Sequence, residues 1–183
     1  MSSDIDLLGR APVWRDYLTL LAREDLSFDH PPPLRGPAER TDAMRRAIDL
    51  LWSAFACQNI SWIGFYEKTS GQDEMTLACR EPKPACSPIG LHGMCGRGWQ
   101  EKRPIIIADV ATLGANYIAC DPKDRSELVI PCIDDDGECW GVLDADSYET
   151  GAFDEHDAQG MTKLLIALGL THKAMLIERP MRL

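Results

Sequence analysis

The chain has 183 residues, 45% of them hydrophobic, which is enough to bury one core and favours a single domain. A formal net charge of −10 and a pI near 4.8 leave no broad positive field, which argues against nucleic acid or an anionic membrane surface as a partner. The longest apolar stretch, 164–170, is too short to cross a bilayer, and the N-terminus does not read as a secretory signal. We therefore expect a cytoplasmic protein whose partners are small molecules or proteins.

Two helices are predicted near the N-terminus. The first, Val13–Glu24, is amphipathic and carries an apolar stripe made of Val13, Trp14, Tyr17, Leu18, Leu20 and Leu21. The proline-rich segment Asp29–Pro37 cannot continue a helix and is expected to be an extended connector. Thr41 is the expected N-cap of a second helix that ends near Cys57. Residues 1–40 are thus assigned as a helix and connector of the same domain, and 41–183 as its main part.

After Asn59 the hydrophobic period changes to two, which is typical of strands. A short helix over Met94–Glu101 is expected within the strand region, and a last helix follows its cap Asp154, with an inner stripe of Met161, Leu164, Leu165 and Leu168. This order predicts an α+β fold, with an antiparallel sheet of about five or six strands and helices mostly on one face. The predicted strands are Ile60–Glu67, Glu74–Cys79, Pro104–Ala108, Glu127–Ile133 and Glu138–Asp146.

The pair Asp136–Gly137 favours a two-residue type I′ hairpin turn between the last two strands. That turn sets Glu127 opposite Asp146 and Val129 opposite Asp144. Because side chains alternate along a strand, the three acids then share one face of the sheet. The same face is expected to carry Trp140, Val142 and Ile133.

Three carboxylates on one sheet face repel one another, so sheet architecture alone explains them poorly. They suggest a site in which at least one acid stays protonated near neutral pH and titrates together with its neighbours. The alternative is that the strand ends reach solvent and the acids are merely hydrated. A slip of one residue in the register would also move Glu127 to the opposite face.

The chain has seven cysteines, an odd number that makes a fixed set of disulfides improbable. Zinc is the rival explanation, but the sequence holds no CxxC pair and the remaining spacings do not match a structural zinc site, so no metal is predicted. Any disulfide is expected to be transient. We expect Cys57, Cys79, Cys132 and Cys139 to be small buried apolar residues.

The blocks PACSPIG, GMCGRGW, ADV, IACD, RSELVIP and GVLDADS resemble, in order and spacing, the free methionine-(R)-sulfoxide reductases, which are single GAF-domain enzymes. The similarity covers roughly 59–157 and includes the strand NISWIGFYE. It implies that 41–183 is a GAF domain. It also implies redox cysteines at Cys86, Cys95 and Cys120, and substrate binding by Trp62, Tyr66, Glu127, Asp144 and Asp146.

The resemblance implies the reduction of free L-methionine-(R)-sulfoxide without a cofactor, by a homodimer that a thioredoxin-like dithiol recycles. We assign the attack to Cys120, the resolution of the resulting sulfenic acid to Cys86, and a secondary or relay role to Cys95. The attacking and resolving roles of Cys120 and Cys86 remain open to exchange.

The chain departs from the usual family pattern at several positions: the approach LACREPKPAC to Cys86, the pair Leu91–His92, Tyr117 where a histidine is common, and Ala145 between two acids. Two other functions compete with the enzyme. A GAF sensor would bind a small molecule without turnover, because the fold alone does not decide function. A thiol redox switch that modulates a partner would tolerate the loss of Glu127, Asp144 and Asp146, whereas an enzyme would not.

Overall fold

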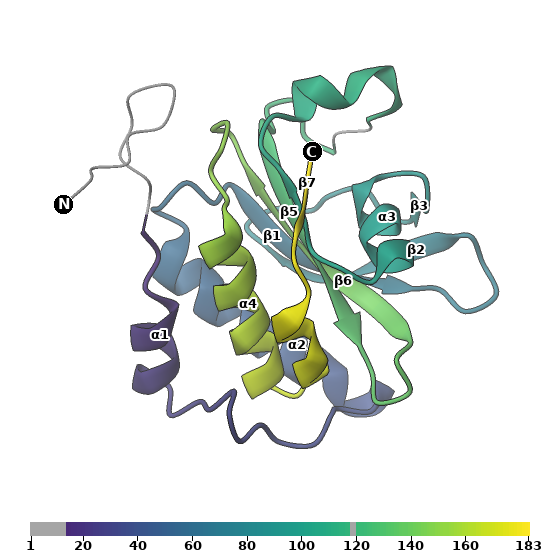
Figure 1. The fold of residues 1–183 in the computed structure, drawn as a ribbon. Coiled ribbons are helices and arrows are strands. Elements are labelled where there is room, and N and C mark those ends of the chain that lie inside the picture. The colour runs from purple at the N-terminus through teal and green to yellow at the C-terminus, as the bar shows by residue number, and fades with distance from the viewer. Residues whose placement is uncertain (1–13, 118–119) are drawn as a thin grey trace.

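The computed structural model describes residues 14–117 and 120–183, and its centre is a mixed sheet (Figure 1). Within the described residues the sheet has seven strands in the order β3-β2-β1-β6-β5-β4-β7, and every neighbouring pair is antiparallel except β4 and β7. The strands are β1 (Trp62–Lys68), β2 (Glu74–Glu81), β3 (Ile89–Gly90), β4 (Ile105–Ile107), β5 (Ser126–Ile133), β6 (Cys139–Ser147) and β7 (Met181–Arg182).

The five predicted strands are confirmed as β1, β2, β4, β5 and β6. The two additional strands, β3 and β7, have two residues each, too few to show a period in the sequence. An antiparallel sheet was predicted. The parallel pairing of β7 with β4 makes the sheet mixed.

Helices lie on both faces of the sheet (Figure 1). One face packs against α2 (Pro37–Phe55) and α4 (Glu155–Ala167), with α1 (Tyr17–Arg23) on the outer side against α4. The other face packs against α3 (Met94–Glu101), which has the predicted bounds. Two 3-10 segments, Val110–Asn116 and Lys173–Ile177, complete the described elements. No described helix combines the length and apolar composition of a membrane span.

The capping of α4 is confirmed, because Asp154 and Asp157 form a reciprocal capping box and the predicted inner stripe is buried. The predicted start of α2 is wrong: the helix begins at Pro37, with Gly36 as its N-cap, so Thr41 lies inside it. Proline suits the first helical turn because its missing N–H would have no partner there.

The predicted apolar stripe of α1 is only partly correct. Asp16 caps the helix and accepts a hydrogen bond from Thr19 N at 2.9 Å, so α1 begins at Tyr17, later than predicted. Trp14 is 69% exposed and Leu18 is 59% exposed, against prediction. Tyr17, Leu20 and Leu21 are buried as expected, and Val13 lies outside the described residues.

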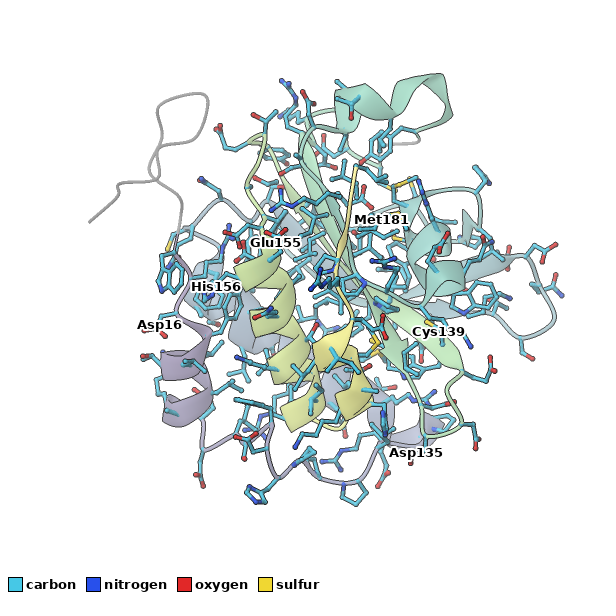
Figure 2. The ribbon with its side chains drawn as sticks, viewed as in Figure 1. Asp16, Asp135, Cys139, Glu155, His156 and Met181 are labelled. Carbon is cyan, nitrogen blue, oxygen red and sulfur yellow. The ribbon has the colours of Figure 1, made fainter. Side chains whose placement is uncertain are left out.

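Arg15, Tyr17 and Asp157 hold α1 against α4. Arg15 is fully buried, and its Nη1 lies 2.8 Å from Asp157 Oδ1. The hydroxyl of Tyr17 donates to the same oxygen at 2.8 Å. Figure 2 labels His156 at the start of α4, where its ring stacks on Trp14 at 3.9 Å between centroids.

The β5–β6 hairpin has the predicted register at its far end but a different turn. Glu127 faces Asp146 and Val129 faces Asp144. The turn is a three-residue loop, because Asp134 N donates to Glu138 O at 2.9 Å and Gly137 has φ +78°. A type I′ turn would need positive φ at both central residues, and Asp136 does not have it.

A bulge at Trp140 restores the register that the longer loop would shift. Ile133 pairs with Cys139 and Cys132 with Gly141, so Trp140 has no partner residue on β5. The bulge turns Trp140 to the face that packs against α2 and α4, where its ring lies 6.4 Å from that of Phe65. The prediction that Trp140 shares the face of the acids is therefore wrong, whereas Val142 does lie on that face.

Candidate active site

A cavity of about 230 Å³ opens between the α3-covered face of the sheet and the loops around it. It gathers residues from β1, β5, β6, the start of α3 and the loops before β3 and β5. Seven of the eight residues predicted for the site line it: Tyr66, Cys86, Cys95, Cys120, Glu127, Asp144 and Asp146.

The structure places the eighth predicted residue, Trp62, beside this cavity. Trp62 lines a neighbouring cavity of about 260 Å³, which shares Cys120, Asp124 and Asp146 with the first. Its ring lies 6.1 Å from the ring of Tyr66, and its Nε1 donates to Lys83 O at 2.9 Å. Trp62 thus supports the wall of the first cavity and the loop that carries Cys86.

The three predicted acids project from neighbouring strands onto one buried face. Glu127, Asp144 and Asp146 are only 5%, 7% and 8% exposed. Burial raises the pKa of Asp144 to about 7, and burial together with repulsion from Asp144 raises the pKa values of Glu127 and Asp146 well above the ordinary range. The acids are therefore not simply hydrated, and the group holds protons near neutral pH.

Asp124 is a fourth buried acid of the cavity that the sequence analysis did not identify. It is 5% exposed and precedes β5, where no strand period reveals the direction of its side chain. Burial and repulsion from Asp121 raise its pKa to about 6. Its Oδ1 is buried without a hydrogen-bond partner.

Cys95 lies at the floor of the cavity and the other two cysteines lie at its rim. Cys95 is in the first turn of α3 and is buried, and burial and the neighbouring Asp144 raise its pKa well above the ordinary range. Cys86 and Cys120 are exposed. Partial desolvation of the Cys120 sulfur and its hydrogen bond with the Cys86 side chain raise the pKa of Cys120 to about 12.

All seven cysteines carry free thiols. Cys79, Cys132 and Cys139 are buried as predicted, but Cys57 is exposed just beyond the end of α2, against prediction.

Two contacts fix the loops that carry Cys86 and Cys120. Tyr66 donates its hydroxyl to Cys86 O at 2.8 Å. Lys83 forms an ion pair with Asp121, and both groups contact the hydroxyl of Tyr148 at 3.0 Å. The residues just before Cys120, Ile118 and Ala119, lie outside the described residues.

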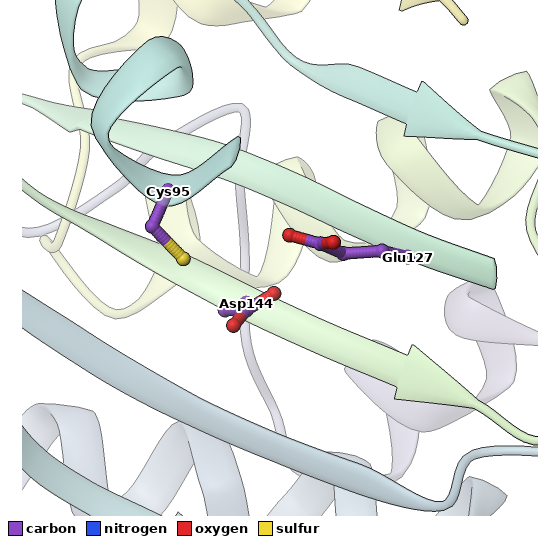
Figure 3. A group of neighbouring side chains, drawn as sticks. All are labelled: Cys95, Glu127 and Asp144. Atoms are coloured by element: carbon purple, nitrogen blue, oxygen red, sulfur yellow. The ribbon is translucent and has the colours of Figure 1, made fainter. Parts of the chain in front are cut away.

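The residue types at the cavity floor are also those that bind metal ions. The Sγ of Cys95 and carboxylate oxygens of Glu127 and Asp144 all lie within 4.8 Å of one another (Figure 3).

Comparison with known proteins places this chain in a family. Residues 37–165 match the model of the GAF domain family. The chain is 35% identical to the free methionine-R-sulfoxide reductase of Escherichia coli (strain K12), over 79% of this chain and 84% of that protein. It is 34% identical to the enzyme of the same name from Saccharomyces cerevisiae, over 66% of this chain and 69% of that protein.

A solved structure is also similar to this chain. The X-ray structure of the free methionine-R-sulfoxide reductase of Neisseria meningitidis in complex with its substrate superposes with a TM-score of 0.64 at 35% identity, over 72% of this chain and 78% of that chain. The chain belongs to the GAF-domain free methionine-R-sulfoxide reductase family.

The departures from the usual pattern of this reductase family have different consequences. Tyr117 donates its hydroxyl to Glu127 Oε2 at 2.9 Å, so it holds one of the buried acids. His92 lines the cavity. Ala145 belongs to the core on the face that packs against α2 and α4, and it does not line the cavity. Lys83, in the altered segment before Cys86, makes the ion pair with Asp121.

Proposed function

We propose that this chain reduces free L-methionine-(R)-sulfoxide to methionine. The observation that carries the proposal is the meeting of Cys86, Cys95 and Cys120 with buried, proton-holding acids in one cavity. A sulfoxide needs both a sulfur nucleophile and a proton donor at its oxygen, and the cavity supplies these two groups side by side. Membership of the reductase family supports the same substrate.

In the proposed reaction, the Cys120 sulfur attacks the sulfoxide sulfur while a protonated acid of the cavity protonates the oxygen. Asp144, with a pKa of about 7, is suited to that role. Because Cys120 is a protonated thiol at rest, its proton needs an acceptor, and Asp124, with a pKa of about 6, lines the same cavity. Methionine leaves, and Cys120 becomes a sulfenic acid.

Cys86 then attacks the sulfenic sulfur of Cys120, which gives a Cys86–Cys120 disulfide and one molecule of water. An external thioredoxin-like dithiol reduces this disulfide by exchange and restores both thiols. Cys95, which lies deeper, keeps a secondary or relay role. Glu127 and Asp146 bind the ammonium group of the free amino acid, and Trp62 and Tyr66 give the apolar surface for its methyl end. We further propose that the protein acts in the cytoplasm as a homodimer.

The test of the activity is coupled turnover. Purified protein with a thioredoxin system should consume NADPH with free L-methionine-(R)-sulfoxide, and much less with the S epimer or with peptide-bound sulfoxide. Absence of turnover in the presence of the recycling system would favour a GAF sensor, a function suggested for a similar protein of Burkholderia vietnamiensis.

The test of the roles is a single turnover without reductant. Cys120→Ser should release no methionine, whereas Cys86→Ser should release one equivalent and then stop. If Cys86→Ser blocks even the first equivalent, the attacking and resolving roles are exchanged.

A further inference from the structure

Three side chains that can ligate a metal converge at the cavity floor from three separate elements. Cys95 comes from the first turn of α3, and Glu127 and Asp144 come from β5 and β6 (Figure 3). Their ligating atoms all lie within 4.8 Å of one another, and all three residues are buried. Glu127 and Asp144 are diagonal neighbours on the paired strands, so the sheet fixes their separation.

The described surroundings of this group, the residues that line the cavity, hold no lysine or arginine that could balance its charge. The Oδ1 atoms of Asp144 and of the nearby Asp124 are both buried without a hydrogen-bond partner. Buried carboxylate oxygens are normally paired or coordinate a metal, so this floor is suited to a positively charged ligand.

We propose that the reduced protein binds a thiophilic divalent cation of the Zn²⁺ type through Cys95, Glu127 and Asp144. One sulfur and two carboxylate ligands suit Zn²⁺ and Co²⁺ better than Mg²⁺ or Ca²⁺, which prefer oxygen alone. Three protein ligands leave one position of a tetrahedral site for water, as in zinc sites that keep an open position, and all three residues line the cavity. On binding, the thiol of Cys95 and the protonated carboxyl groups of Glu127 and Asp144 release their protons to solvent. Bonds to the metal take the place of the S–H and O–H bonds, without a change of oxidation state.

Tyr117 acts as the outer support of this site. Its hydroxyl donates to Glu127 Oε2 at 2.9 Å, which orients the carboxylate and leaves its other oxygen available to the metal. Sequence spacing did not predict this site, because its ligands come from a helix and from two strands and share no short motif.

The site gives the protein a regulatory property that rests on the proposed function. The same floor would receive the ammonium group of methionine sulfoxide, so the cation and the substrate exclude each other. The cation therefore inhibits turnover, and free methionine sulfoxide displaces it.

The experiment is a titration with Co²⁺, which substitutes for Zn²⁺ and reports a cobalt–thiolate bond by its absorption. The reduced Cys86→Ser/Cys120→Ser protein is used, because it lacks the exposed thiol pair at the rim. We expect it to bind one Co²⁺ per chain with a charge-transfer band. Adding Cys95→Ser should remove the band and weaken binding by more than about a hundredfold, since loss of an outer support alone costs about 10–100-fold.

A second variant, Glu127→Gln in the same background, should keep the thiol but weaken Co²⁺ binding, and circular dichroism checks that each variant is folded. Failure of the double variant to bind Co²⁺, or a band that survives Cys95→Ser, would overturn the site. Displacement is tested separately with free L-methionine-(R)-sulfoxide. If Co²⁺ binds as expected but the sulfoxide does not displace it, the metal site stands and the proposed substrate position fails.

Discussion

Asp144 illustrates how the surroundings of one side chain set its chemistry. It lies on the buried face of β6, beside Glu127 and Cys95, and its pKa is raised to about 7 chiefly by burial. In the unfolded chain the same carboxyl group has an ordinary pKa of about 4. The folded protein therefore holds a proton that the unfolded chain releases, which makes the acid useful in catalysis and costly for stability.

Replacement of Asp144 by asparagine should stabilise the protein at pH 8 by on the order of 2 kcal/mol. Below about pH 4 both states of the wild-type chain are protonated, so the gain disappears there; it grows as the pH rises through the window between about 4 and 7. Urea unfolding at pH 4, 6 and 8 measures it. The matched control is Asp135→Asn. Asp135, labelled in Figure 2, is exposed on the hairpin loop, so its replacement should change the free energy of unfolding little. Equal effects of the two variants at pH 8 would contradict the assignment.

The shared face of Glu127, Asp144 and Asp146 could be predicted from the sequence because strand alternation and a hairpin register depend on local residues. Asp124 could not be predicted, because it lies in a loop whose direction is set by packing. Trp140 was predicted on the wrong face because a bulge, which has no clear sequence signal here, compensates for a longer turn.

At the scale of elements, two loops far apart in the sequence are joined beside the site. Lys83, in the loop after β2, pairs with Asp121, which follows Cys120, and Tyr148 after β6 contacts both. The hydrogen bond with Lys83 holds the pKa of Asp121 at about 2, so this carboxylate stays charged throughout the working pH range. Lys83 lies three residues before Cys86 and Asp121 directly follows Cys120, so we expect the pair to favour the approach of the two sulfur atoms.

Lys83→Met should slow the closure of the Cys86–Cys120 disulfide without changing the first release of methionine. The effect should be no more than about fivefold, because exposed ion pairs contribute about 1 kcal/mol or less. Rapid-quench thiol alkylation after one equivalent of substrate separates the two steps. Lys102→Met, which breaks an ion pair with Glu138 on the distant hairpin, is the control. Equal closure rates in the wild type and Lys83→Met would rule out a role for the pair.

At the scale of the whole molecule, α1 is held by a buried ion pair rather than by an extended apolar stripe. Arg15 has no exposed surface and pairs with Asp157, the same residue that completes the capping box of α4. It also donates to Ala152 O at 3.1 Å and to Gln58 O at 2.5 Å. Sequence patterns predicted a helix here. They could not predict the Arg15–Asp157 ion pair that holds it, because the two residues lie far apart in the sequence.

Arg15→Met should lower the free energy of unfolding by about 3–5 kcal/mol, since it leaves the buried carboxylate of Asp157 without its cation. Thermal and urea unfolding measure the loss. Arg23→Met, which removes an exposed pair with Glu24 on the same helix, should cost no more than about 0.5 kcal/mol. Similar losses in the two variants would show that the buried pair does not anchor α1.

The direct test of the central claim is the mapping of disulfides after one equivalent of free L-methionine-(R)-sulfoxide is added to the reduced protein without reductant. Non-reducing peptide mass spectrometry should find one Cys86–Cys120 disulfide per methionine released, with Cys57, Cys79, Cys132 and Cys139 still free. Methionine release without that disulfide, or a disulfide formed mainly by other cysteines, would contradict the account.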